Sequence, residues 1–288
     1  MVKSSRSDYI LRAVIIVVLC GAAFIALIPL LSVFSKSLSS RLAVEADKVT
    51  LLPVNFTLDS WAYMMEKGDI WRSFAVTVGA TFIGTILALV LNVLTAYPLS
   101  KKEFPLSKAL LFCVLIAMIF KAPLVPYFLT VRAVKLYDNP WVLVIPQLFS
   151  EFNLMIMITF MRQFPVELEE AAIVEGSGYF RRLFTIVLPL SKAPLATLGM
   201  FYAVILWNQF QHPLLFIQSP EWYPLQIKIR QLITSENALP LSGLINLNYN
   251  MTTLQSVAIV FAIIPILVMY PFLQKYFAKG AMVGSIKG

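Results

Sequence analysis

Six apolar segments, each long enough to cross a lipid bilayer, constrain the fold of this chain more than any other feature. One helical crossing needs about 20 apolar residues, because the hydrocarbon core is about 30 Å thick and a helix rises about 1.5 Å per residue. Backbone amides in lipid must find partners within their own segment, which favours helices. The sequence therefore predicts an all-α polytopic membrane protein, with residues 1–288 as one transmembrane domain. The segments run over 10–34, 72–98, 107–130, 140–161, 193–217 and 253–277.

The overall composition excludes a soluble domain, since 59% of the 288 residues are hydrophobic and 13% are charged. The formal net charge of +8 raises the question of nucleic-acid binding. The basic residues, however, are scattered at the ends of apolar segments instead of forming one patch. We therefore expect no nucleic-acid partner. The first apolar segment is longer than the apolar core of a signal peptide and is expected to be retained.

The cysteines and the histidine do not indicate a catalytic or metal site. Cys20 and Cys113 lie in apolar segments without a CxxC pattern, and His212 is the sole histidine. The sequence contains no GxxxxGK[ST] loop, so this chain is not expected to bind and hydrolyse ATP by itself. We expect no catalytic residue, no metal and no cofactor in the chain.

The distribution of lysine and arginine predicts the orientation in the membrane. With the amino terminus inside, 13 of the 23 basic residues lie on the cytoplasmic side. The external loop at 36–70 has four basic residues, and its acidic residues offset them. Both termini and the polar stretch 165–194 are therefore predicted to face the cytoplasm.

Residues 165–194 form the longest strongly polar run between the apolar segments of the second half. Val166–Val174 lacks glycine and proline and is rich in helix-forming residues, with acidic side chains early, where the helix dipole favours them. Gly176 and Gly178 predict a stop and a tight bend, and Pro189 breaks the chain before the next apolar segment. The prediction is helix, turn and helix outside the bilayer.

The spacing within this stretch resembles the EAA loop of ABC importer permeases. It runs Glu170-Ala171-Ala172, three residues, Gly176, nine residues, Ile186, one residue, Leu188-Pro189. Glu175 is a departure, because the family usually has aspartate before the glycine. The resemblance is to the maltose-type carbohydrate branch and covers nearly the whole chain. It implies a type I permease with six transmembrane helices, whose EAA loop forms a cytoplasmic coupling helix held in a cleft of the ATPase. The implied coupling residues are Glu170, Ala171, Ala172, Gly176, Ile186, Leu188 and Pro189.

The same resemblance implies a set of partners and a location. The partners are a homologous second permease subunit, two ATPase subunits that hold ATP and Mg²⁺, an extracytoplasmic solute-binding protein and a carbohydrate. The location is the bacterial cytoplasmic (inner) membrane. The external loop 218–250 is expected to meet the binding protein. The carboxyl end, KYFAKGAMVGSIKG, resembles tails of a subgroup that transports complex oligosaccharides or polysaccharide fragments. The mechanism implied is ATP-driven alternating access, with neutral oligosaccharides and acidic fragments such as alginate both open as substrates.

Polar residues within the apolar segments are candidates for the substrate pathway, because an intramembrane charge or amide needs water or a partner. Lys121 lies about 14 residues, or roughly 21 Å, from the cytoplasmic start of its segment. Its ammonium either faces the pathway or reaches the outer headgroups. Asn208 is either glue between helices or a substrate contact. The candidates are Lys121, Asn153, Trp207, Asn208 and Gln209.

Two other classes of membrane protein require features that the sequence shows only weakly or not at all. An ion-coupled secondary carrier needs intramembrane carboxylates or broken helices repeated in both halves, and Glu151 alone qualifies clearly. A membrane enzyme needs histidines, cysteines or paired acids at one membrane depth, and the sequence shows no such constellation.

Overall fold

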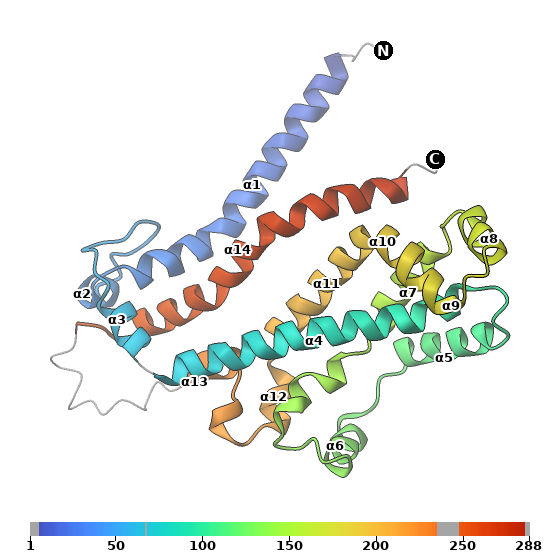
Figure 1. Cartoon of the computed structure of the whole chain (residues 1–288). Helices are drawn as coiled ribbons and strands as arrows, with labels where there is room; N and C mark the ends of the chain where they lie inside the picture. The colour runs from blue at the N-terminus through green and yellow to red at the C-terminus, as the bar shows by residue number, and fades with distance from the viewer. Residues whose placement is uncertain (1–5, 67, 235–247, 286–288) are drawn as a thin grey trace. The chain divides into compact units, whose positions relative to one another are not determined.

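The computed structural model describes residues 6–66, 68–234 and 248–285, and the regular elements in these residues are all helices (Figure 1). The chain divides into two compact units. The first consists of residues 1–70 and 229–264, and the second of residues 71–228 and 265–288. Part of the external loop predicted at 218–250, namely 235–247, lies outside the described residues, as do the last three residues of the carboxyl tail.

Among the described residues, three helices are long and apolar enough to cross a membrane without a break. They are α1 (Arg6–Ser37), α4 (Gly68–Ser100) and α14 (Met251–Ser285). They coincide with the predicted segments 10–34, 72–98 and 253–277. The helical, polytopic fold class predicted from the sequence is confirmed.

The other three candidate crossings are pairs of helices that bend at a short break. The pair α5 (Ser107–Ile119) and α6 (Leu124–Ala133) bends by 117°. The short 3-10 turns η1 (Pro140–Leu143) and η2 (Ile145–Gln147) meet α7 (Glu151–Met161) at 44°. Residues Tyr179–Leu190 meet α11 (Lys192–Trp207) at 82°.

The break between α5 and α6 corrects the expectation of one helix over 107–130. The backbone of Phe120 is extended, and Pro123 stands at the N-cap of α6. Proline has no amide hydrogen, and its ring pushes the preceding residue out of helical geometry. Lys121 therefore lies in a non-helical link and not inside a helix.

The fifth apolar segment also differs from one continuous helix. Helix α11 ends at Trp207, Asn208 is its C-cap, and a short helix, α12 (Gln211–Phe216), follows after the break. The Asn208 side chain donates from Nδ2 to the carbonyl of Val204 at 2.9 Å, which satisfies a carbonyl in the last turn of the helix. Trp207-Asn208-Gln209 thus form the end of a helix and the turn after it.

In the first unit, short helices outside the apolar segments are held by side-chain hydrogen bonds. Helix α2 (Arg41–Glu45) begins at Ser40, whose hydroxyl accepts from the amide of Ala43. The guanidinium of Arg41 donates to the Glu45 carboxylate at 2.7 Å and lowers the pKa of that carboxyl. Helix α3 (Asp59–Glu66) is tied to the start of α14 by the Ser60 hydroxyl, which donates to Thr253 at 2.9 Å.

In the second unit, α4, α7 and α11 share one core. Two glycines let α4 and α11 approach closely: a Cβ at Gly84 would lie 2.8 Å from Leu206, and one at Gly199 would lie 3.3 Å from Leu89. A buried amide of Asn92 donates to the Tyr202 hydroxyl at 3.2 Å across the same pair of helices. The members of this core, which we call the central core, are Val93, Ala96, Tyr97, Leu99, Leu154, Met157, Ile158, Met161, Leu183, Val187 and Leu198.

At the other end of α4, a carboxylate joins two loops of the second unit. Asp138 accepts hydrogen bonds from the amides of Gln218 and Ser219 at 2.9 and 2.8 Å, and from the Ser219 hydroxyl at 2.7 Å. These donors stabilise the charged form and lower the pKa of Asp138. The link between α6 and η1 is therefore fixed to the chain that follows α12.

Candidate functional site

Helix α8 (Val166–Val174) begins directly after Pro165, as the sequence predicts. It ends in a Schellman motif: the amide of Gly176 donates to Ile173, and that of Ser177 to Ala172, both at 2.9 Å. Gly176 has φ +75°, a conformation that glycine adopts without steric cost. The glycine of the EAA spacing thus sets the direction in which the chain leaves α8.

The surface of α8 is divided between a buried residue and an exposed face. Ala172 is only 6% exposed, whereas Glu170, Ala171 and Gly176 are exposed. Beside Glu170 the helix exposes two large apolar side chains, Ile173 and Val174, of which Val174 is 89% exposed. A carboxylate beside exposed apolar side chains forms a surface suited to another protein.

A π-helical turn follows α8 in the same loop. The order is α9 (Tyr179–Arg182), η3 (Leu183–Val187) and α10 (Leu188–Leu190), and the amide of Leu188 donates to the carbonyl of Leu183, five residues back. Pro189 supplies a reason, because its ring would clash with the carbonyl four residues before it in an ordinary helix. The wider turn avoids that contact, and π turns of this kind often mark functional sites.

The remaining EAA residues lie on this turn and differ in exposure. Ile186 and Leu188 are half-buried, and Pro189 is exposed. Their neighbours Leu183 and Val187 are 2% and 1% exposed and belong to the central core. The loop is therefore packed directly against α4, α7 and α11 and is not loosely attached to them.

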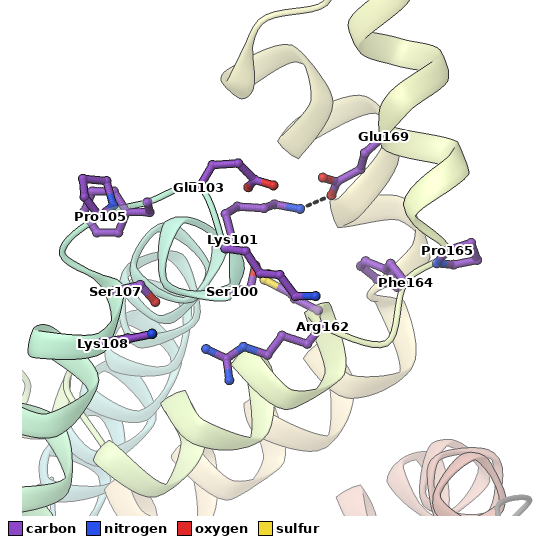
Figure 2. Close-up of a pocket in the computed structure, with 13 residues that line it drawn as sticks. Ser100, Lys101, Glu103, Pro105, Ser107, Lys108, Arg162, Phe164, Pro165 and Glu169 are labelled. Atoms are coloured by element: carbon purple, nitrogen blue, oxygen red, sulfur yellow. Dashed lines mark hydrogen bonds and ion pairs between the residues drawn. The ribbon is translucent and has the colours of Figure 1, made fainter.

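An ion pair that sequence reasoning missed joins α8 to the end of α4. Lys101 donates to Glu169 (Figure 2). The Lys101 ammonium also lies 4.8 Å from the centre of the Tyr97 ring. Both charged side chains are mostly shielded, with 16% and 15% exposed. The two partners are 68 residues apart, so no local spacing links them. The available signal was an acidic helix predicted on the same membrane side as the Lys101-Lys102 pair.

Beside this ion pair, a cavity of about 920 Å³ opens among the ends of α4, α5 and α7, with α8 along one rim (Figure 2). Arg162 lines this cavity and donates from Nη2 to the Leu99 carbonyl at 3.2 Å. The Ser107 hydroxyl donates to the same carbonyl at 2.9 Å. The residues that line the cavity include the four cations Lys101, Lys102, Lys108 and Arg162 and the two carboxylates Glu103 and Glu169.

The predicted pathway residues fall into two groups by exposure. Lys121, with 70% of its side chain exposed, lies with Nζ 3.3 Å from the nearer carboxylate oxygen of Glu151. Asn208 is also exposed. Asn153 and Gln209 are buried, and Gln209 donates to the Leu143 carbonyl at 3.1 Å. Trp207 is buried as well, with 7% exposed.

The described residues contain no group of three or more histidine, cysteine or acidic side chains that could hold a metal ion. Comparison with known proteins decides between the remaining classes. Residues 93–283 match the family of binding-protein-dependent transport system inner membrane components. The chain belongs to this family.

Curated relatives of this permease match it over nearly its whole length. It is 34% identical to the polygalacturonan/rhamnogalacturonan transport system permease protein YtcP of Bacillus subtilis, over 92% of this chain and 94% of that one. It is 36% identical to the protein LplC of the same organism, over 95% and 93% of the two chains. The arabinooligosaccharides transport system permease protein AraQ of Halalkalibacterium halodurans is 28% identical, over 92% and 93%.

A solved structure supports the same assignment. The permease superimposes with a TM-score of 0.90 on a chain from the crystal structure of a bacterial ABC transporter involved in the import of the acidic polysaccharide alginate. The two are 31% identical, and the match covers 96% of this chain and 100% of the other. The protein is therefore a permease subunit of a binding-protein-dependent ABC importer and is not itself an enzyme. The ion-coupled carrier and the membrane enzyme are not supported.

Proposed function

We propose that this permease imports a fragment of a polysaccharide, with acidic oligosaccharides as its substrate class. Two of the relatives carry uronic-acid polymers in their names, polygalacturonan/rhamnogalacturonan and alginate. Each is at least 31% identical to this chain over more than nine-tenths of its length. Of the neutral and acidic carbohydrates that the sequence left open as substrates, these relatives favour the acidic ones.

The proposed topology has six crossings, both termini in the cytoplasm and α8 on the cytoplasmic side. Each bent pair counts as one crossing in this arrangement. The positive-inside distribution of lysine and arginine supports the orientation. The loop 165–194 then lies where an ATPase can reach it.

The coupling role of this loop rests on one observation, which is the shared central core. Leu183 and Val187 of η3 pack in the same buried cluster as residues of α4, α7 and α11. Protein interiors are close-packed and resist gradual deformation. A displacement of the loop by the motor must therefore be accompanied by movement of the crossings.

In this mechanism the ATPase supplies a binding difference between two states. ATP and Mg²⁺ are held by two ATPase subunits, which close on α8 of this chain and on the equivalent helix of a homologous permease. A ligand shifts a two-state equilibrium only by its difference in affinity for the two states. The exposed carboxylate of Glu170 and the apolar side chains beside it supply contacts that can differ between open and closed motors. An extracytoplasmic binding protein delivers the carbohydrate from the other side.

For the substrate pathway, Lys121 and Asn208 are the strongest candidates, because both side chains are exposed. The Asn208 side chain donates to Val204 of its own helix and not to another helix. This favours a substrate contact over a hydrogen bond between helices. The burial of Asn153 and Gln209 favours a structural role for these two in the conformation described. Trp207, which is also buried, is proposed to have a packing role next to Asn208.

The deciding experiment is ligand-dependent ATP hydrolysis by the purified complex in vesicles, with both permeases, the ATPase and the binding protein. Oligomers of galacturonate, of alginate and of a neutral sugar of equal length are compared. We expect an acidic oligomer to stimulate hydrolysis and to accumulate in the vesicles. Stimulation by the neutral oligomer alone would overturn the proposal of an acidic substrate. If none of the three oligomers is taken up, the assignment of a carbohydrate substrate is refuted.

A further inference from the structure

The cavity among the ends of α4, α5 and α7 is lined by more cationic than anionic side chains. Lys101 is paired with Glu169, and Arg162 spends one donor on the Leu99 carbonyl. In the described part of the chain, Lys102 and Lys108 have no carboxylate within ion-pair distance. With Lys101 and Glu169 paired, three cations, Lys102, Lys108 and Arg162, remain in the cavity lining against one carboxylate, Glu103.

Two of these cations, Lys108 and Arg162, extend toward the same part of the cavity. Figure 2 shows the side chains of Lys108 and Arg162 pointing toward one another, while Glu103 lies on the other side, near Lys101 and Glu169. Like charges held at one site destabilise each other unless an anion lies between them. The first turn of α5 adds to the positive potential, because Leu106 at its N-cap provides no side-chain cap.

The surface of α5 indicates what kind of anion fits. Phe112, Leu115 and Ile119 follow Lys108 at spacings of four, seven and eleven residues, so all four share one face of the helix. These three apolar side chains are 63%, 42% and 74% exposed. A basic cavity at the head of an exposed apolar stripe matches a molecule with an anionic head and hydrocarbon chains.

We propose that this cavity binds the phosphate of an anionic phospholipid of the cytoplasmic leaflet. Lys102, Lys108 and Arg162 hold the phosphate, and the acyl chains lie along the apolar face of α5. Basic pockets between the cytoplasmic ends of transmembrane helices suit such headgroups. The inference rests on the proposed orientation, which places this end of α4 in the cytoplasm. A bound headgroup also joins the ends of three helices beside α8.

The test uses the complete complex with its partner permease and ATPase, reconstituted in phosphatidylcholine with or without phosphatidylglycerol. Lipid retained after detergent extraction is measured by native mass spectrometry. In the Lys102→Gln/Lys108→Gln variant we expect the preference for phosphatidylglycerol to fall roughly thirty-fold, since each of the two lysines contributes about 1 kcal/mol and about 1.4 kcal/mol is a factor of ten. The control, Arg12→Gln/Lys192→Gln, removes two charges on the same membrane side outside the cavity and should retain the preference.

Three outcomes would overturn the proposal. An equal loss in the control would mean that surface charge in general attracts the lipid. Thermal stabilisation by inorganic phosphate without retained phosphatidylglycerol would mean that the cavity takes free phosphate. Cross-linking of Lys108 to a partner subunit would mean that a protein carboxylate fills it. Carbohydrate uptake in the same vesicles separates these results from a failure of the proposed function, because uptake can persist without the lipid site.

Discussion

Lys121, in the link between α5 and α6, forms an ion pair with Glu151, the first residue of α7, with Nζ 3.3 Å from the nearer carboxylate oxygen. The lysine is largely exposed, and exposed pairs contribute only about 0–1 kcal/mol. Opening the pair therefore costs little. We propose that a carboxylate on the substrate replaces Glu151 as the partner of Lys121.

This exchange predicts opposite effects for the two residues. Lys121→Met should lower uptake of an acidic oligosaccharide by up to about five-fold, because an exposed charge pair contributes about 0–1 kcal/mol. Glu151→Gln should raise it relative to a neutral sugar of equal size, because the competing carboxylate is gone. Uptake of both sugars into vesicles is measured. Equal losses for the two sugars in Lys121→Met would remove Lys121 from the pathway.

Substitutions at Gly176 are expected to be harmful because of the backbone conformation of this residue and not because space for a side chain is lacking. Gly176→Ala meets no atom within 4 Å, but φ +75° costs a residue with a Cβ about 1–2 kcal/mol. We expect a distorted end of α8 and a lower ratio of uptake to ATP hydrolysis, with a larger effect for Gly176→Leu. Gly178→Ala is the matched control, since Gly178 also has open space and an ordinary φ of −68°. Equal ratios in the two alanine variants would contradict the prediction.

Glu170→Ala should separate ATP hydrolysis from transport while leaving the crossings folded. The exposed carboxylate is predicted to make a charge-assisted contact with the motor, and such contacts are about twice as strong as neutral ones. The comparison is Glu167→Ala, an exposed acid on the same helix outside the EAA spacing. Uptake and phosphate release are recorded together. Wild-type uptake in Glu170→Ala would exclude this role.

The pair Lys101–Glu169 is expected to hold α8 in place. Its shielding lies between that of surface and buried pairs, so breaking it should cost about 1–3 kcal/mol. Lys101→Glu and Glu169→Lys should each reduce the ratio of uptake to hydrolysis, and the double exchange should restore part of it. Failure of the double variant to recover, with all proteins equally stable, would show that the pair does not position α8.

Gly84→Ala should destabilise the contact between α4 and α11. The added Cβ would lie 2.8 Å from Leu206, which is 1% exposed, and overpacking costs about 1–3 kcal/mol. Gly79→Ala on the same helix meets nothing within 4 Å and should be neutral or stabilising, because alanine favours helices by about 1 kcal/mol. Thermal unfolding of the purified complex compares the two. Leu206→Val should relieve the strain of Gly84→Ala.

The lengths of apolar segments predicted α1, α4 and α14 well, since each is one unbroken run that must satisfy its amides in lipid. The same argument failed for 107–130. Pro123 could be read as a site of strain, but the bend of 117° depends on what packs around it. Likewise, the sequence did not indicate that α11 ends at Trp207, where Gln209 donates to the distant Leu143 carbonyl and Pro213 follows in α12.

Within the candidate site, local rules succeeded where the geometry is local. The stop at Gly176 follows from the conformational freedom of glycine, and the helix before it from helix-forming residues. The partner of Lys101 could not be predicted, because it depends on how the end of α4 meets α8. Sequence spacing directed attention to Glu170, whereas its neighbour Glu169 makes the contact within the chain.

The π turn at Leu183–Val187 makes the length of this loop more important than its composition. Each residue of a helix advances its side chain by about 100°. Deleting one residue to restore a regular turn would therefore rotate everything before it by nearly a third of a revolution relative to α11. The apolar side chains of α9 would then face a different direction, and α8 would contact the ATPase in a different orientation. We expect the segment between Gly176 and Pro189 to accept substitutions at its exposed positions but no insertion or deletion.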